Sequence, residues 1–260
     1  MFTLRRTCGV LTLVASLVAV TACRPDSDPE RPADGPGRDG VPTVGDPPPD
    51  LVDVQQIEPS IRTEIRYAGA DNFVGEPVVG YQAAKCLLAR SAAEALAGVQ
   101  RELAAAGLGL LVYDCYRPQR AVDHFVRWAA DTADRATKAA YYPNVDKSRL
   151  FAEGYIAERS GHSRGATVDL TLVREPSVAA DADPAGGHEA EPLDMGTPYD
   201  FFDPRSHTES PEVTEEQLAN RLRLREAMGA GGFRNYEAEW WHYTLRDEPY
   251  PDRFFDVPVR

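Results

Sequence analysis

The sequence predicts a single α+β domain, with a central, mainly antiparallel sheet flanked by helices. Strand-like and helix-like stretches are mixed along the chain without regular βαβ alternation, which favours antiparallel over parallel pairing. The 260 residues, 43% of them hydrophobic, suffice for one compact domain with a tail. No internal repeat is visible.

The N-terminal segment carries signals for export rather than for folding. Arg5 and Arg6 precede an apolar run, Gly9–Val20, which is shorter than the ~20 residues needed to span a bilayer and is typical of a signal-peptide core. Val20-Thr21-Ala22-Cys23 resembles the lipobox of bacterial lipoproteins, which implies cleavage before Cys23 and a lipid on its sulfur. An ordinary secretory peptide is the alternative.

A stretch rich in Pro, Gly and Asp follows and lacks the large apolar residues that a core needs, so it predicts a flexible tether. We therefore expect an exported protein, anchored by lipid at the bacterial cell membrane, in the cell envelope. Its expected parts are a signal peptide over 1–22, a tether over 23–50 and a folded domain over 51–260.

The first half of the domain predicts two strands and two helices. Ile61–Tyr67 alternates apolar and charged residues, which indicates a strand. Ala83–Ala106 has apolar residues at helical spacing and ends before a glycine, a common helix stop. Leu108–Tyr113 is a continuous apolar run, typical of a buried strand. Pro118 suits the first turn of a helix that continues over Ala121–Ala130.

The second half predicts two helices around a central strand. We expect a short helix over Ser148–Ala157 and a strand over Thr167–Val173, where apolar and polar residues alternate. The acidic, Pro/Gly-rich stretch Arg174–Pro211 is long for a loop, and such loops are usually functional or disordered. Thr214–Met228 opens like a capping box and predicts a helix. Closing strands are expected at Phe233 and over Trp240–Leu245.

The formal net charge of −13 excludes one class of partner. Nucleic-acid binding requires a clustered basic surface to neutralise phosphates, and the sequence has no such cluster. We therefore expect no nucleic-acid partner. The oligomeric state is left open.

The four cysteines divide into two groups under this scheme. Cys8 leaves with the signal peptide and Cys23 carries the lipid, so Cys86 and Cys115 remain as an even pair in an oxidising compartment. A disulfide between them would close a loop of about 30 residues and stabilise the fold by roughly 3 kcal/mol. Two buried free thiols are the alternative; zinc binding by this pair is less favoured because a better ligand set exists.

Two short clusters carry the residue types of a catalytic zinc site. In Ser160–Leu172, His162 and Asp169 lie on either side of a Ser-Arg-Gly corner, and Glu239 and His242 lie near the C-terminus. Such a site needs three protein ligands, an open position for water and a base that is not a ligand.

The spacing constrains how these residues can meet. Gly161 and Gly165 permit the turn that would bring His162 and Asp169 together. Glu239 precedes His242 by three, and a regular strand would place them on opposite faces, so we expect Glu239 in a loop or bulge before the strand. The remaining histidines are interpreted as structural or surface residues: His124, His188 and His207.

Four segments of the sequence, in this order, resemble those of a known enzyme family: IRYAGADNFVGEPVVGY, YDCYRP, SGHSRGATVDLTL and EWWHYTL. These resemble the VanX-type D-alanyl-D-alanine dipeptidases of the zinc D,D-peptidase family, whose fold is shared with the hedgehog signalling domain. The resemblance covers most of Val52–Leu245 and implies a hedgehog/D,D-peptidase-like fold with one Zn²⁺ per chain.

The resemblance also implies residue roles. The zinc ligands would be His162, Asp169 and His242. Glu239 would be the catalytic base and Arg117 the group that stabilises the transition state. The family's substrate contacts would fall on Tyr67, Tyr81, Asp114, Ser160 and Asp200. For Arg117, a structural arginine paired with Asp114 is the alternative.

The implied activity is zinc-dependent hydrolysis of D-alanyl-D-alanine to two D-alanines, in peptidoglycan turnover or salvage. The expected tether favours one alternative, a D,D-carboxypeptidase or endopeptidase that acts on peptidoglycan stem peptides. A non-catalytic peptide-binding lipoprotein is a further alternative. A serine enzyme sensitive to β-lactams is disfavoured, because Ser160 lacks the S-x-x-K pattern.

Overall fold

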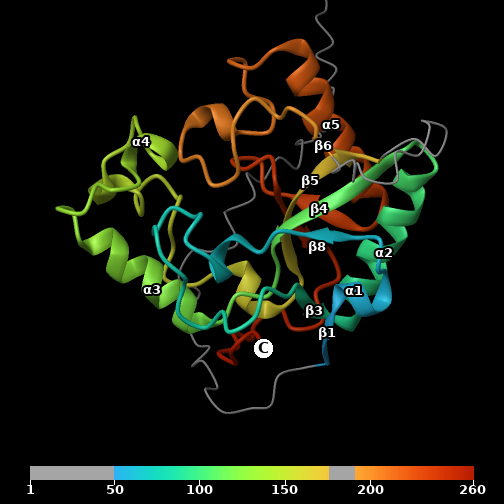
Figure 1. Ribbon diagram of the computed structural model, residues 1–260, viewed down its shortest axis with the longest axis horizontal. Coiled ribbons are helices and arrows are strands. Elements are labelled where there is room, and N and C mark those ends of the chain that lie inside the picture. Colours follow the sequence, from blue (N-terminus) through green and yellow to red (C-terminus); the bar gives the residue numbers. More distant parts are fainter. Residues whose placement is uncertain (1–49, 176–190) are drawn as a thin grey trace, which may run out of the picture. The chain divides into compact units, whose positions relative to one another are not determined.

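The computed structural model describes residues 50–175 and 191–260 (Figure 1). The chain divides into two units, Met1–Pro32 and Ala33–Arg260, and every described residue belongs to the second. The predicted signal peptide, the lipidation site Cys23, most of the tether and the middle of the acidic loop therefore lie outside the described residues. Within the described ranges, no helix is both long and apolar enough to cross a membrane.

A mixed sheet forms the centre of the described domain, with strand order β2–β4–β5–β8–β7 and β6 paired to β5. All neighbours are antiparallel except β2 and β4, which are parallel. The predicted α+β domain with a mainly antiparallel sheet is confirmed. The strands are β2 (Arg62–Thr63), β4 (Leu108–Asp114), β5 (Thr167–Arg174), β6 (Glu191–Pro192), β7 (Phe233–Asn235) and β8 (His242–Leu245).

A separate two-stranded ribbon pairs β1 (Leu51–Asp53) with β3 (Leu87–Ala89) in antiparallel register. The ribbon contacts the turn before β5, because the Ala89 amide donates to the Gly165 carbonyl at 2.7 Å.

The helices surround the sheet. In Figure 1, α1 (Val54–Ile57) and α2 (Arg90–Ala104) lie to the right, and α3 (Gln119–Ala130) and α4 (Lys138–Tyr141) lie to the left. The remaining helix, α5 (Glu215–Ala230), packs against α2 and β7. Its N-terminus has the predicted capping box between Thr214 and Gln217.

The central strand β5 has two different faces because its side chains alternate. Val168, Leu170 and Leu172 point one way and are fully buried, which gives the helices an apolar surface to pack on. Thr167, Asp169 and Thr171 point the other way and are also buried. Buried polar side chains are stable only when other groups form hydrogen bonds or ion pairs with them. The partners of this polar face belong to a candidate site.

The three largest differences between the sequence predictions and the structure concern one strand and two helices. Of the strand expected over Ile61–Tyr67, only β2 forms; a 3₁₀ turn over Arg66–Ala68 follows, because the Asn72 amide binds the carbonyls of Arg66 and Gly69 and bends the chain. The bend buries Tyr67, which is 1% exposed.

The other two differences concern helix bounds. The helix expected from Ala83 begins only at Arg90, because β3 pairs with β1 first. The helix expected over Ser148–Ala157 is a 3₁₀ turn, Lys147–Arg149, followed by turns. Gly154, with φ of 81°, adopts a left-handed conformation that a right-handed helix cannot continue through.

Candidate active site

The predicted corner between His162 and Asp169 is a 3₁₀ helix, Gly161–Arg164, followed directly by β5. The Ser160 hydroxyl oxygen accepts a hydrogen bond from the His162 amide at 3.3 Å and caps this turn. Gly165 ends it in the left-handed region, at φ of 80°. The chain then enters β5 with Asp169 in register between Asp114 of β4 and His242 of β8.

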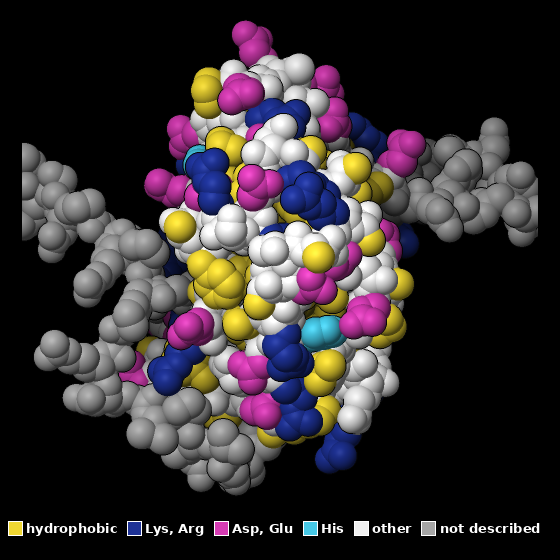
Figure 2. Space-filling model, turned by 90° about the vertical axis from the view of Figure 1, so that its left-hand side faces the viewer, with side chains coloured by type: hydrophobic (Ala, Val, Ile, Leu, Met, Phe, Trp, Pro, Cys, Tyr) yellow, Lys and Arg dark blue, Asp and Glu magenta, His cyan; other side chains and the backbone are white. Residues whose placement is uncertain are grey.

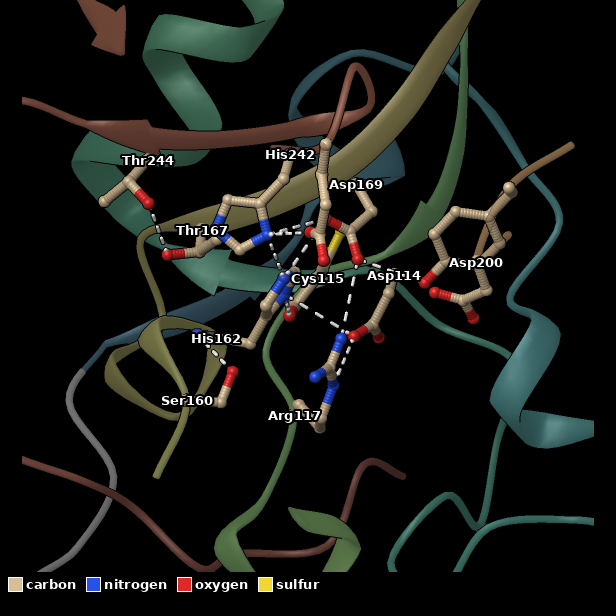
Figure 3. A network of polar contacts seen from close by, with 12 residues as sticks. Asp114, Cys115, Arg117, Ser160, His162, Thr167, Asp169, Asp200, His242 and Thr244 are labelled. Carbon is tan, nitrogen blue, oxygen red and sulfur yellow. Dashed lines mark hydrogen bonds and ion pairs between the residues drawn. The ribbon is translucent and has the colours of Figure 1, made fainter. Parts of the chain in front are cut away.

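Three atoms from these residues form a close triangle. His162 Nε2 and His242 Nδ1 each lie 3.2 Å from Asp169 Oδ1, and the two nitrogens are 3.4 Å apart (Figure 3). Donor atoms in a tetrahedral zinc site, each about 2.0–2.2 Å from the ion, are separated by roughly 3.4 Å. Asp169 Oδ1 is also buried without a hydrogen-bond partner. The triangle therefore fits a tetrahedral metal ion with one position left for water or substrate.

The tautomer of His162 suits metal binding. Its Nδ1 lies 2.7 Å from the Cys115 carbonyl oxygen. Because a carbonyl can only accept, Nδ1 carries the hydrogen and Nε2 keeps a free lone pair facing Asp169. A hydrogen bond of this kind on the second nitrogen is the usual way in which a metal-binding histidine is oriented.

The second oxygen of Asp169 has its own donors. Oδ2 accepts from the Tyr199 hydroxyl at 3.0 Å and lies 3.5 Å from Arg117 Nη2, so Oδ1 alone faces the two histidines. Burial raises the pKa of Asp169, but His162 and His242 lower it more, to well below its usual range. A metal would therefore meet an ionised carboxylate.

Glu239 lies beside the triangle without belonging to it. It occupies a turn before β8, as predicted, and Asn235 holds that turn by donating to the carbonyls of Glu239 and His242 at 3.0 Å each. Its Oε2 lies 3.3 Å from His242 Nδ1, and its side chain is 16% exposed. Burial lowers the pKa of His242, but the carboxylates of Asp169 and Glu239 raise it more, to about 10.

Arg117 connects this centre to an aromatic wall. Its Nε donates to Asp114 Oδ2 at 2.9 Å, while its guanidinium stacks over the rings of Tyr67 and Phe125 at 5.0 and 5.1 Å. The pairing with Asp114 proposed as the structural alternative is therefore present. Arg117 Nη2 also lies 3.5 Å from Asp169 Oδ2. The ion pair with Asp114 therefore holds the guanidinium next to the triangle and is compatible with a role for Arg117 there.

Two of the expected substrate contacts instead support these groups. Asp114 is fully buried, its Oδ1 accepts from the Tyr81 hydroxyl at 2.6 Å, and its Oδ2 is engaged by Arg117. With both oxygens occupied, Asp114 is poorly placed to receive a substrate ammonium. Tyr81 acts through Asp114 in the same arrangement.

The other expected contacts lie around the centre. Asp200 has φ of 59° and accepts from the Tyr67 hydroxyl at 2.8 Å. Burial and the charge of Asp169 raise the pKa of Asp200 well above its usual value, so a cationic group beside it would favour ionisation. The Asp200 loop is held by the buried Arg221 of α5, which donates to backbone carbonyls including that of Met195 at 2.6 Å. Ser160 is partly exposed at the edge.

Sequence reasoning missed Tyr199 and Arg221. Tyr199 immediately precedes Asp200, which the resemblance marks as a substrate contact, and this is the one available signal. Its contact with Asp169 joins residues 30 positions apart, and no local pattern indicates such a pair.

Comparison with known proteins gives a consistent result. A family model described as D-ala-D-ala dipeptidase matches residues 49–260. A D-alanyl-D-alanine dipeptidase of Streptomyces coelicolor is 44% identical over 210 residues, covering 81% of this chain and 98% of that protein. One of Enterococcus faecium is 41% identical over 207 residues, covering 80% and 96%. One of Enterococcus faecalis is 43% identical over 199 residues, covering 76% and 93%.

Proposed function

This chain belongs to the D-Ala-D-Ala dipeptidase family, and from that premise we propose that it is a zinc enzyme that hydrolyses D-alanyl-D-alanine to two D-alanines. The observation that carries the proposal is the triangle of His162, Asp169 and His242, with edges of 3.2–3.4 Å and Glu239 beside it. We assign the three as ligands of one Zn²⁺ per chain and Glu239 as the base.

Zinc held by these residues would supply Lewis-acid activation of water and of the peptide carbonyl. The Glu239 carboxylate would accept a proton from the attacking water and later give it to the leaving amine. The Arg117 guanidinium, which is always charged, would stabilise the oxyanion that develops on the carbonyl. Asp114 and the rings of Tyr67 and Phe125 hold that guanidinium in place.

The ammonium and the carboxylate of a free dipeptide can be bound by polar residues that the catalytic step does not use. Its ammonium and carboxylate lie within a few ångströms of each other, so a site that binds both must be small and carry both kinds of partner. We assign Asp200 to the ammonium and the hydroxyl of Ser160 to the carboxylate. The buried Trp240 and Trp241 are 2% and 1% exposed, so we assign them to packing rather than to substrate binding.

Zinc binding and turnover should separate in two variants. His162→Ala should lose bound zinc, because it removes a donor atom. Glu239→Ala should keep zinc and lose about 10²–10⁴-fold in kcat, the usual contribution of a general base. Glu237→Ala, an exposed glutamate in the same turn, is the matched control and should behave as the wild type. Equal zinc loss in the His162 and Glu239 variants would overturn the base assignment.

The substrate is tested by D-alanine release from free D-Ala-D-Ala beside a stem pentapeptide ending in D-Ala-D-Ala. The zinc-loaded chain from Arg24 onward should cleave the dipeptide and leave the pentapeptide intact. Cleavage of the pentapeptide would instead indicate a D,D-carboxypeptidase with the same zinc chemistry. Binding of either peptide without turnover would indicate a peptide-binding protein.

We also propose that the protein acts outside the cytoplasm in peptidoglycan turnover or salvage, held at the membrane by lipid on Cys23. The proposal is supported by the signal-like residues 1–22 and the tether-like residues 23–50. It is supported further by the Cys86–Cys115 disulfide, since structural disulfides are typical of exported proteins. In this setting the substrate would come from the cell wall.

A further inference from the structure

The Cys86–Cys115 disulfide lies next to the candidate metal centre. It joins two cysteines 29 positions apart, 0% and 1% exposed, with their Cα atoms 5.1 Å from each other. Cys86 immediately precedes β3, and Cys115 immediately follows β4. Figure 3 shows Cys115 close to His162 and Asp169. The bond therefore connects the edge ribbon to the segment that borders the centre.

The segment from Cys115 to Arg117 forms hydrogen bonds with both the ring and the backbone of His162. The Cys115 carbonyl accepts the Nδ1 hydrogen of His162 at 2.7 Å, and the Arg117 amide donates to the His162 carbonyl at 3.3 Å. The position of this segment thus helps to fix the tautomer and the direction of the imidazole, together with Asp114 Oδ2, which lies 3.5 Å from the same Nδ1.

The ribbon strand β3 contacts both sides of this arrangement. Its Leu87 carbonyl accepts from the Tyr116 amide at 2.9 Å, and its Ala89 amide donates to the Gly165 carbonyl at 2.7 Å. Hydrogen bonds therefore tie β3 to the segment after β4 and to the turn that carries His162. The disulfide is the covalent link in this network.

We propose that the Cys86–Cys115 disulfide is a positioning device for the metal ligand His162, acting through the Cys115 carbonyl. This inference rests on the proposed metal centre. Without the bond, the Cys115 carbonyl is held only by its attachment to β4, by packing and by the hydrogen bonds of its neighbours, so the Nδ1–H tautomer and the direction of Nε2 are less fixed. In a reducing compartment, the chain would then have a weaker zinc site than after oxidation.

The test is zinc affinity, measured by competition with a chromophoric chelator, together with the visible absorption spectrum of the Co²⁺-substituted protein. Cys86→Ala, Cys115→Ala and the double variant should all bind zinc about 10-fold more weakly than the wild type, at the low end of the range for lost support of a ligand. Because each removes the same bond, the two single effects should not add. Wild-type protein refolded under reducing conditions should match the double variant, and the Co²⁺ spectrum should change in all four samples.

A variant that only lowers stability is the control. Leu103→Ala creates a cavity at the far end of α2, and it should lower the melting temperature while leaving zinc affinity and the Co²⁺ spectrum unchanged. Equal weakening in this control would overturn the inference, since global stability would then explain the effect. Wild-type affinity in Cys86→Ala would also overturn it, even if Cys115→Ala were weak.

Failure of the metal centre itself would look different. If the wild type bound zinc no more tightly than His162→Ala, the proposed zinc site would be wrong, and this inference with it. If the wild type bound zinc tightly and all the cysteine variants did too, only the role of the disulfide would be wrong.

Discussion

Asp169 sets the geometry of the centre because its two oxygens have different partners. Oδ1 faces His162 and His242, while Oδ2 accepts from Tyr199 at 3.0 Å. Tyr199→Phe removes one donor and keeps the ring, which stacks on Tyr113 at 4.7 Å. We expect zinc affinity to fall by about 10-fold, the low end for such partners, and stability by about 1 kcal/mol.

Chelator competition measures this loss, and Tyr113→Phe is its matched control. Tyr113 is the stacking partner of Tyr199 and belongs to the same aromatic pair. Its hydroxyl lies near the charges of Arg66 and Glu64 rather than at the triangle. Similar zinc affinities in the two variants would contradict the role given to the Tyr199 hydroxyl.

His242 gives the centre a pH dependence. In the metal-free protein, burial lowers its pKa, but Asp169 and Glu239 raise it to about 10, so Nδ1 holds a proton at neutral pH. Zinc requires the unprotonated nitrogen and must displace that proton. Apparent zinc affinity should therefore increase with pH through the neutral range, by about tenfold per unit for one proton, and level off above about pH 10.

Calorimetric titration in buffers of different ionisation enthalpy measures this proton directly, and about one should be released per zinc near neutral pH. The same titration of Glu239→Gln should release less, since one of the charges that raise the pKa of His242 is gone. An affinity that is constant between about pH 6 and pH 8 would contradict the assignment.

The sequence identifies candidate metal ligands and bases better than it identifies the residues that form hydrogen bonds with them and hold them in place. His162, Asp169, His242 and Glu239 are recognisable because imidazoles and carboxylates at these spacings suit a metal and a base. Tyr199 supports Asp169 through a contact that depends on how a distant loop packs, so no spacing marks it. Asp114 was marked by the resemblance, but its complete burial becomes visible only in the structure.

At the scale of elements, the corner before β5 depends on one glycine. Of the two glycines expected to permit the turn, Gly165 takes a positive φ, 80°, and a Cβ there would lie 2.9 Å from Leu51 Cδ2. Gly165→Ala should cost roughly 1–2 kcal/mol for the left-handed backbone alone and should weaken zinc binding by displacing His162.

Urea unfolding of the metal-free protein measures the free energy of unfolding of Gly165→Ala. Gly98→Ala is the matched control. Gly98 lies within α2, and a Cβ there would have no neighbour within 4 Å. That substitution should raise stability by about 0.5–1 kcal/mol and leave zinc binding unchanged. If Gly165→Ala were as stable as the wild type, the corner would tolerate a different backbone.

Elements with a strong local signal could be predicted from the sequence, and elements that depend on a partner strand could not. The apolar run of β4, the alternation of β5 and the capping box of α5 are local signals that match the structure within a residue or two. In contrast, β2 and β3 have two and three residues, and each exists because a partner strand lies beside it. The periodicity of Leu87 and Leu88 fits a helix or a strand equally well, and pairing with β1 decides between them.

At the scale of the whole molecule, the site depends on contacts between distant parts of the sequence. His162 and His242 are 80 positions apart and meet only because β5 and β8 pair in register. On the face shown in Figure 2, acidic and basic side chains are interspersed, in keeping with the absence of a basic cluster from the sequence. The proposed chemistry therefore uses residues of the described domain, and the proposed role of residues 1–50 is export and anchoring.

Replacing Cys23 tests that last point. Cys23→Ala removes the sulfur that would carry lipid, so the full chain should leave the membrane fraction and lose incorporation of labelled fatty acid. The physical reason is that each buried CH₂ of an acyl chain contributes about 0.8 kcal/mol to membrane binding, and no helix of the described residues could replace that anchor. Cys8→Ala, in the expected signal peptide, is the matched control and should stay labelled and membrane-bound. A labelled Cys23→Ala protein would place the anchor elsewhere.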